Sequence, residues 1–451
     1  MQNLIFKPQN YSDERKMILD FTISNFRSIR EPQTISFEAT KDTHLEDYYV
    51  VKKGDYRVLK MAIILGANAS GKSNIVKAFD LFLKLMIIPC ENKQSKIEYA
   101  KFALDKEYAK QDSIIIINFL CGEQKYRYEV HFNNDMITYE SLQRHPFGEL
   151  RSHKVFERTT NIQSRLSTIK WGEKFRSNSN SRALNVNLLH NRTVFGAFQS
   201  SNVDIPWMQE IVMWLNNYVL PTNAFTIAVV TRLLESDYID KSMMTKQLQK
   251  ADIGISHFLI ERKKKSIPII KILDGDNDIS DYQTFDDIVV RLSHRGKDGI
   301  IPFDFEQESG GTQRFFELSG LLLELVDKPH FAYIDELECR LHPDLYTHFI
   351  TTFLHNAKES QIVFTTHSRE FLADKDMFRD DIVWFTEKND EGATELYSLA
   401  DFGSDVLRDS SNRYNFYRAG RLGGVPRLGD TYIANPNNVE KDGEGNKKEK
   451  N

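Results

Sequence analysis

The residues most able to do chemistry stand in one glycine-containing run, Gly66-Ala-Asn-Ala-Ser-Gly-Lys-Ser73. Its glycines allow successive backbone N–H groups to point inward around phosphate oxygens. Lys72 can place its charge on the terminal phosphates of a nucleotide, and the Ser73 hydroxyl can ligate Mg²⁺. The run therefore predicts a nucleotide site made by Gly66, Asn68, Ser70, Gly71, Lys72, Ser73 and Asn74.

The elements around this run decide against a chance match in a structural loop. Residues 61–65 are an unbroken apolar strand that leads directly into it. Behind it, apolar residues recur at helical spacing, at Ile75, Val76, Phe79, Phe82, Leu83 and Met86. Strand, loop and helix follow in the order that a phosphate site needs, because the helix adds its positive N-terminal end.

Two adjacent carboxylates, Asp335 and Glu336, end the apolar run of residues 331–334. In proteins with a phosphate loop of this kind, an Asp at the end of a strand holds Mg²⁺ directly or through water. Asp335 and Ser73 are therefore the predicted metal ligands. Glu336 is then placed to polarise the attacking water as a general base. The alternative is that both acids only cap the next segment, but the phosphate loop upstream favours the catalytic interpretation.

Two further motifs stand in order around these carboxylates. Residues 308–313 read Glu-Ser-Gly-Gly-Thr-Gln and open a helix, where a Ser and two glycines at the N-terminus form an anion site. His367 ends a second apolar strand in the run Thr-Thr-His-Ser. Alone, each would be read as an ordinary turn or a structural histidine. Their order along the chain favours function for Ser309, Gly310, Gly311 and His367.

Together the motifs resemble those of ABC-type AAA ATPases of the RecF, SMC and OLD-like group. The resemblance implies that Ser309, Gly310 and Gly311 are the signature, which closes over the γ-phosphate bound by a second copy. It implies that His367 contacts the γ-phosphate, and that Glu336 and His367 are catalytic in ATP hydrolysis. It further implies ATP and Mg²⁺ as cofactors, and a homodimer or higher homo-oligomer. Residues 337–343 lie where this group carries a loop that crosses the dimer interface.

The chain start and end refine the resemblance. Residues 23–28, ISNFRS, resemble a strand and turn near the nucleotide in RecF, SMC and repair ATPases. There Asn25 and Arg27 either reach the nucleotide or are ordinary turn residues, and Gln143 is a candidate for the glutamine of the lid loop. Residues 416–426 resemble the closing segment of RloA/AbiLi-type ATPases. The chain thus looks closest to RloA/AbiLi-type and PARIS-type anti-phage defence ATPases.

Length and composition predict the domain organisation. At 451 residues, with 41% hydrophobic and 27% charged residues, the chain exceeds one ordinary globular core. The resemblance implies an α/β fold, an ABC-type P-loop ATPase head of mixed sheet with flanking helices, split over residues 17–143 and 301–430. Residues 144–300 are predicted to be a mostly helical insert, a sensor, lid or partner surface. Residues 431–451 are predicted to be disordered.

Charge and cysteine content exclude several classes of protein. The net charge of −5 rules out a polycation, so nucleic acid could bind only through a local patch. Residues 144–192 are such a patch, with ten Lys or Arg, three Glu and no Asp, and are either a solvated surface or a DNA contact. Three scattered cysteines predict neither disulfides nor zinc. With no apolar leader and no apolar run of about 18 residues, we expect a cytoplasmic protein without membrane contact.

Three functional hypotheses stay open. OLD proteins carry a Toprim nuclease after the ATPase, whereas only 84 residues follow His367. In the first hypothesis the ATP-bound dimer therefore senses a phage trigger protein and controls a separate effector, such as a Toprim-like nuclease. In the second it is a RecF/SMC-like repair ATPase that binds DNA through the basic region of residues 144–192, and neutralising Arg151, Lys154 and Arg158 should then abolish binding. In the third it is an ATP-dependent scaffold with little turnover.

Overall fold

The computed structural model describes residues 16–426. Gaps within this range cover residues 89, 150, 177, 222–224, 252, 274–275, 404–406 and 408–411. Residues 431–451, the tail predicted to be disordered, lie outside the described residues.

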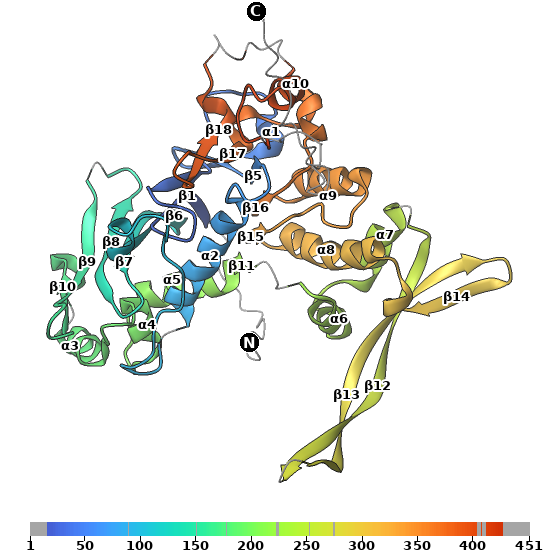
Figure 1. Ribbon diagram of the computed structural model, residues 1–451, viewed down its shortest axis with the longest axis horizontal. Helices are drawn as coiled ribbons and strands as arrows, with labels where there is room; N and C mark the ends of the chain where they lie inside the picture. The colour runs from blue at the N-terminus through green and yellow to red at the C-terminus, as the bar shows by residue number, and fades with distance from the viewer. Residues whose placement is uncertain are drawn as a thin grey trace, which may run out of the picture.

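A six-stranded sheet lies at the centre of the molecule (Figure 1). In spatial order its strands are β11 (Val219–Leu220), β15 (Phe331–Ile334), β16 (Gln361–Thr365), β5 (Met61–Gly66), β17 (Val383–Lys388) and β18 (Thr394–Ser398). All neighbours pair in parallel except β17 and β18. Parallel strands end at the same edge, so the loops that follow β5, β15 and β16 meet there.

A second sheet contains seven antiparallel strands. In spatial order they are β10 (Ser167–Trp171), β9 (His153–Thr160), β8 (Ile137–Pro146), β7 (Gln124–Phe132), β6 (Ser113–Cys121), β1 (Met17–Ser24) and β2 (Gln33–Ser36). Side chains along β7 alternate between buried and partly exposed, as expected for a strand with one face in the core. The two sheets and their helices confirm the predicted mixed α/β class.

Helix α2 (Lys72–Ile87) is packed between the two sheets. The Phe79 ring stacks on Phe21 of β1, with ring centroids 4.2 Å apart. On its other side Phe79 contacts Phe331 and Tyr333 of β15, at centroid distances of 5.2 and 5.6 Å. The apolar positions predicted at helical spacing therefore do not form a single stripe, because both sheets bury the helix.

The buried amide of Gln361 joins the same two sheets. Its Oε1 accepts hydrogen bonds from Ile18 N of β1 at 2.7 Å and from the Tyr218 hydroxyl at 3.0 Å. Its Nε2 donates to the carbonyl oxygens of Ile18 and Leu59, at 2.9 and 3.1 Å. A buried amide left unpaired costs about 1–3 kcal/mol, so these bonds fix the start of β16 against β1.

Residues 144–300 are not mostly helical, contrary to the prediction. The predicted boundary at residue 143 falls inside β8, and β9 and β10 extend the seven-stranded sheet beyond it. Helices follow, namely α3 (Asn178–Asn187), α4 (Val194–Gln199), α5 (Pro206–Tyr218), α6 (Ile227–Glu235) and α7 (Lys241–Lys250). Gln199 of α4 donates to the carbonyl oxygen of Met86 at 2.7 Å, so this part of the predicted insert packs on α2.

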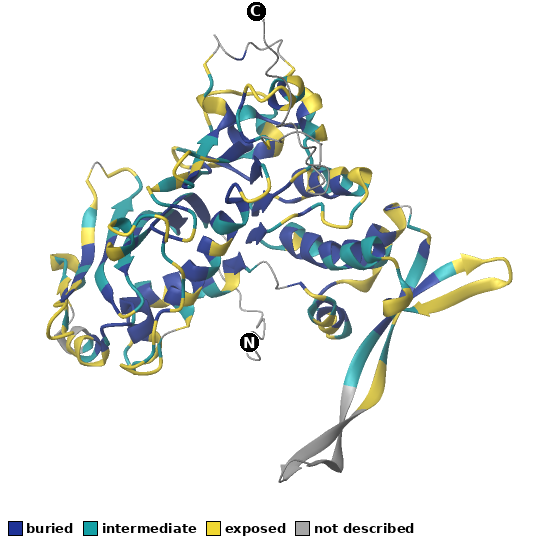
Figure 2. Cartoon of the chain, viewed as in Figure 1, coloured by how far each residue is buried: buried dark blue, intermediate teal, exposed yellow. Residues whose placement is uncertain are grey.

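The rest of the predicted insert is a β-ribbon that projects from the head (Figure 1). Strands β12 (Ile255–Leu273) and β13 (Asp276–Gly296) pair along their length, and β14 (Gly299–Asp304) pairs with the end of β13. β14 is exposed almost throughout (Figure 2). Ion pairs join Lys265 to Asp287 and Lys263 to Asp304, each at 3.6 Å. Opposite charges on neighbouring strands are stabilising, so these pairs support the ribbon.

The C-terminal part of the chain returns to the central sheet. Helices α8 (Gly310–Asp327) and α9 (Pro343–Asn356) pack together beside it (Figure 1), and α10 (Arg413–Arg418) lies near the chain end. α8 begins at the Ser-Gly-Gly run, which confirms the prediction that residues 308–313 open a helix. The remaining elements are short: α1 (Glu46–Tyr49), β3 (Val50–Lys53), β4 (Tyr56–Leu59), and single turns at Tyr108–Lys110, Glu173–Phe175, Phe305–Gln307, Glu370–Ala373, Lys375–Met377, Asp380–Ile382 and Leu399–Asp401.

One residue of the basic patch is an internal cation. Arg158 of β9 is 0% exposed, and its Nη2 donates to the carbonyl oxygens of Leu189 and His190. Its Nη1 lies 3.8 Å from Oε2 of Glu140, which is also fully buried. Burial raises the pKa of Glu140 to about 7, and the Arg158 charge opposes that shift. Arg158 is therefore not available to DNA, although the second hypothesis needs it to contact DNA.

The packing of α2 predicts that Phe79→Ala will lower the free energy of unfolding by about 3–5 kcal/mol, because the variant leaves a cavity between the sheets. Urea denaturation followed by circular dichroism measures this change. Val186→Ala is the control, since Val186 is 83% exposed on α3 and should change stability by no more than about 0.5 kcal/mol. Equal effects of the two substitutions would contradict the role assigned to α2.

Candidate functional site

The predicted phosphate loop connects β5 to α2, with its backbone turning through residues 66–71. Asn68 is exposed at the tip of the loop, and Lys72 is buried at the start of the helix. Lys72 Nζ donates to the carbonyl oxygens of Gly66 and Ala67, at 2.8 and 3.0 Å. Burial lowers the pKa of the Lys72 ammonium, and nearby carboxylates oppose this shift. The loop thus holds its cation against two carbonyl oxygens of its own backbone.

Two glycines let this loop lie directly against the hairpin of β17 and β18. A Cβ atom at Gly71 would lie 2.2 Å from Thr394 Oγ1, and one at Gly66 would lie 2.4 Å from Thr386 Oγ1. The Ser70 hydroxyl bonds Thr386 Oγ1 at 2.6 Å, and the Ser70 carbonyl accepts from Thr394 Oγ1 at 2.8 Å. Any larger residue at Gly66 or Gly71 would force the loop off the hairpin.

Asp335 leaves the end of β15 and faces the phosphate loop. Its Oδ1 accepts hydrogen bonds from Ser73 Oγ at 3.0 Å and from Thr365 Oγ1 at 2.7 Å. Mg²⁺ prefers such hard oxygen ligands and usually takes only one or two from the protein. Within the described residues no group of three His, Cys, Asp or Glu side chains is suited to a metal. Ser73 and Asp335 supply two such oxygens side by side, which fits an ion that takes its remaining ligands from outside the protein.

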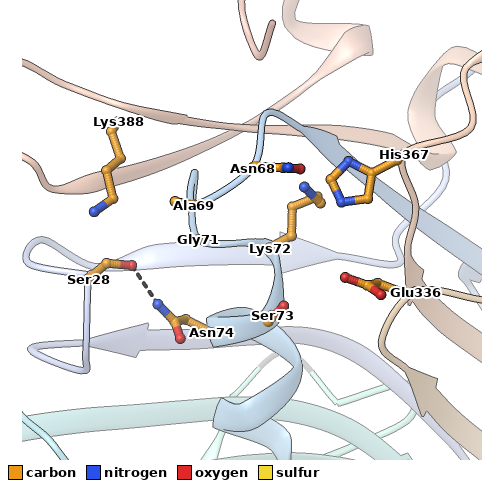
Figure 3. A pocket seen from close by; sticks show the side chains of 10 residues that line it. All are labelled: Ser28, Asn68, Ala69, Gly71, Lys72, Ser73, Asn74, Glu336, His367 and Lys388. Carbon is orange, nitrogen blue, oxygen red and sulfur yellow. Dashed lines mark hydrogen bonds between the residues drawn. The ribbon is translucent and has the colours of Figure 1, made fainter. Parts of the chain in front are cut away.

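Glu336 is aimed by a left-handed backbone. Its φ angle of 51° is one that such a residue rarely adopts, at a cost of about 1–3 kcal/mol. Its N–H donates to Thr365 Oγ1 at 2.8 Å, and its carbonyl accepts from Cys339 N at 3.0 Å. These two bonds hold the strained turn, and the exposed carboxylate points into the same space as Lys72 (Figure 3).

His367 follows β16 and reaches this space from the neighbouring strand end. Its backbone N–H donates to the carboxylate of Glu338, and Ser368 N donates to the Thr366 hydroxyl at 3.0 Å. The imidazole is exposed and lies beside Lys72 and Asn68 in Figure 3. Strand-end loops that follow β15 and β16 thus place an acid and an imidazole at the phosphate loop.

These groups line one pocket of about 690 Å³ (Figure 3). Its walls are Ser28, Asn68, Ala69, Gly71, Lys72, Ser73, Asn74, Glu336, His367 and Lys388. Of the predicted loop residues, Gly66 and Ser70 are absent from the walls because they support the loop from behind. Two polar residues that we did not predict, Ser28 and Lys388, line the pocket. Ser28 lies inside the NFRS run, but no local sequence signal points to Lys388.

Asn25 and Arg27 do not line the pocket, in contrast to one of the two expectations for them. Asn25 is 0% exposed, and its Nδ2 donates to the carbonyl oxygens of Tyr108 and Gln111, at 3.1 and 2.9 Å. Its Oδ1 accepts from Phe102 N at 3.2 Å. All of the amide is therefore used to hold the turn to residues 102–111.

That turn delivers Ser28 to the pocket in place of its neighbours. Ser28 Oγ accepts from Asn74 Nδ2 at 2.7 Å and lies 2.7 Å from Thr394 Oγ1. Gln143, the candidate for a lid loop, is instead part of β8, opposite Arg127 of β7, and does not line the pocket.

The predicted signature caps α8 at some remove from this pocket. Ser309 Oγ accepts from Thr312 N at 3.1 Å, and the Ser309 side chain is exposed. The two glycines pack under Arg340, because a Cβ at Gly310 would lie 3.3 Å from Arg340 Cδ and one at Gly311 would lie 2.9 Å from its carbonyl oxygen. None of the three signature residues lines the pocket of Figure 3.

A second cavity, of about 700 Å³, lies between α2 and the start of α8. Asp335 and Glu336 line it, together with Gly310 and with Cys339 and Arg340 of the loop predicted to cross a dimer interface. Glu336 lines both cavities, so its carboxylate lies between the phosphate loop and the signature helix of the same chain.

A family model described as "AAA domain, putative AbiEii toxin, Type IV TA system" matches residues 61–374. The match begins at β5 and includes the phosphate loop, the ribbon, the signature, the Asp-Glu pair and His367. A comparison with curated proteins finds no match. Within the described residues, no helix is long and apolar enough to span a membrane.

Among solved structures, similar chains are heads of SMC proteins. One, bound to the C-winged helix domain of ScpA, is 13% identical with a TM-score of 0.41, and the match covers 84% of this chain and 97% of that one. The SMC head domain from Thermotoga maritima is 12% identical, with a TM-score of 0.34 and coverage of 84% and 98%. An Smc head with an extended coiled coil, bound to the C-terminal domain of ScpA from Pyrococcus furiosus, is 13% identical, with a TM-score of 0.38 and coverage of 85% and 96%.

Proposed function

Because the chain belongs to the family described as "AAA domain, putative AbiEii toxin, Type IV TA system", we propose that it binds ATP with Mg²⁺ and hydrolyses it to ADP and phosphate. One observation carries the proposal. Asp335, Glu336 and His367 reach the phosphate loop from neighbouring strand ends, and Asp335 bonds the loop residue Ser73 at 3.0 Å. If residues 66–73 were only a structural turn, the fold would have no need to bring these three side chains to it.

The residues divide the work as follows. Backbone N–H groups of the loop and the Lys72 ammonium bind the β- and γ-phosphates. Ser73 and Asp335 hold Mg²⁺, which neutralises charge on the phosphates when it is bound. Glu336 accepts a proton from the attacking water. His367 contacts the γ-phosphate, so its loop responds to whether that phosphate is present.

The position of the signature supports a site shared by two copies. Ser309 is exposed, and neither it nor the glycines that follow line the pocket of their own chain. A helix N-terminus attracts anions, and α8 presents one that the pocket of the same chain does not use. A second copy therefore supplies Ser309, Gly310 and Gly311 to the γ-phosphate, and each copy does the same for the other.

The biological role we propose is the regulation of a separate effector. The ATP-bound dimer senses a phage component and controls a partner such as a Toprim-like nuclease, as in RloA/AbiLi-type and PARIS-type systems. The family description, which names a toxin of a toxin–antitoxin system, supports a defence role. The exposed strand β14 and the ribbon behind it offer a surface for such a partner.

DNA binding is the second candidate function, favoured by the exposed cations Lys154 and Lys170 on the outer strands β9 and β10. The structure weakens this candidate, because Arg158 is internal and Lys154 forms an ion pair with Glu157. A scaffold that binds ATP without turnover is the third alternative, and the rate of hydrolysis distinguishes it.

Glu336→Gln is expected to bind ATP but to lower its turnover by about 100-fold or more, because the attacking water loses its base. The variant should then elute as an ATP-dependent dimer, as measured by light scattering after size exclusion. Lys72→Ala is the control for binding and should lose affinity for ATP. A Glu336→Gln variant that hydrolyses ATP at the wild-type rate would show that Glu336 is not the base.

Mixing two inactive variants tests whether the site is shared. Ser309→Arg and Lys72→Ala should each lack turnover, for different reasons. An equal mixture should regain about a quarter of the wild-type rate, since half of randomly paired dimers then hold one complete site of two. Full activity of Ser309→Arg alone, or no recovery on mixing, would contradict the dimer model.

The ATP-trapped Glu336→Gln protein is also the bait for the effector. Purified from nuclease-treated native cells with ATP and Mg²⁺, it should retain a nuclease-like partner in stoichiometric amount, identified by mass spectrometry. The Lys72→Ala protein, treated in parallel, should not retain it. Repair proteins that are lost on nuclease treatment would instead favour the DNA-binding alternative.

A further inference from the structure

The hairpin of β17 and β18 covers the phosphate loop and contributes a lysine to the pocket. Lys388, the last residue of β17, pairs directly with Thr394, the first residue of β18. Side chains of directly opposed residues project from the same face of an antiparallel pair. Thr394 Oγ1 donates to the Ser70 carbonyl at 2.8 Å, so this face looks onto the loop. The register alone therefore turns Lys388 toward the phosphate loop.

A second position on the same strand confirms this orientation. Thr386 lies two residues before Lys388, and residues two apart on a strand share a face. The Thr386 hydroxyl bonds the Ser70 hydroxyl at 2.6 Å. The close approach at Gly66 and Gly71, described above, shows that the loop and this face are in direct contact.

The turn after Lys388 is rigid and is tied to the start of the chain. Asn389 Oδ1 accepts from Ala393 N at 3.0 Å, and Asn389 N donates to the Ala393 carbonyl at 2.9 Å. Glu391 at the tip forms an ion pair with Arg30. The backbone of Lys388 is thus fixed, while its side chain is exposed and its ammonium forms no ion pair within the described residues.

Figure 3 shows where this free cation lies along the pocket. Glu336 and His367 stand at one end, Lys72 lies between, and Lys388 stands with Ser28 at the other end. On the function proposed above, the γ-phosphate lies beside Glu336 and His367. The far end of the pocket then meets the part of the triphosphate that is joined to the ribose.

We propose, on the basis of that ATP site, that Lys388 binds the α-phosphate of the nucleotide. A lysine ammonium is a compact point charge that suits a single phosphate group. The α-phosphate is present in ATP and in ADP and does not change during hydrolysis. The contact therefore stabilises bound substrate, transition state and product alike, so the barrier between bound substrate and the transition state of γ-phosphate transfer does not change. A residue of this kind raises affinity without raising the maximal rate.

Lys388→Ala tests this assignment. It should lower the affinity for ATP and the affinity for ADP to a similar extent, by about tenfold, the size expected for one charge-assisted hydrogen bond. The KM for ATP should rise as the affinity falls, while kcat at saturating ATP stays the same. Competition against a fluorescent ATP analogue gives both affinities, and steady-state phosphate release gives kcat and KM. Lys388→Arg keeps the charge and should restore most of the affinity.

Lys358→Ala is the matched control. Lys358 is exposed in the turn before β16, at the opposite end of that strand from the pocket, and its substitution should change neither affinity nor rate. Loss of ATP affinity with unchanged ADP affinity would place Lys388 on the γ-phosphate and overturn the proposal, as would a fall in kcat. If the wild-type chain binds both nucleotides and Lys388→Ala binds them equally well, the Lys388 assignment is overturned and the ATP site is not. A wild-type chain that binds neither would overturn the ATP site itself.

Discussion

The burial of α2 between two sheets sets the position of the phosphate loop and of the strand ends around it. Phe79 contacts Phe21 of the antiparallel sheet on one side and Phe331 of the central sheet on the other. Contacts on both sides fix the helix axis, and with it the position of the phosphate loop at the helix N-terminus. The Gln361 amide holds the same two sheets together by two hydrogen bonds to the backbone of Ile18. Strand ends from distant parts of the chain can then meet at one loop.

Threonine hydroxyls at strand ends organise the groups around that loop. Thr365 donates to the Asp335 carboxylate and accepts from the backbone of Glu336, so one side chain positions both acids. Thr386 and Thr394 hold Ser70 from the opposite side. Threonine suits these places because a β-branched residue fits a strand and its hydroxyl can still donate and accept. The loop is thereby clamped between the end of β16 and the β17–β18 hairpin.

The signature is connected to the acids through the loop that follows β15. Glu336 and Arg340 both have left-handed backbones, with φ angles of 51° and 64°. Two such residues in five fold the segment into consecutive turns, which set Arg340 over Gly310 and Gly311. The loop thus connects the acids directly to the start of the signature helix, and residues of all three line the cavity between α2 and α8.

Three parts of the site could be predicted from local sequence, namely the phosphate loop, the Asp335–Glu336 strand end and the His367 strand end, because each depends on residue types at short spacing inside one element. The strands past residue 143 could not be predicted in this way, since neighbouring strands pair through contacts far apart in sequence. The burial of Arg158 is visible only in the fold, because the sequence does not distinguish a basic side chain in solvent from one beside an internal carboxylate. The same holds for Lys388 in the pocket wall, since its position depends on cross-strand register and on a loop more than 300 residues away.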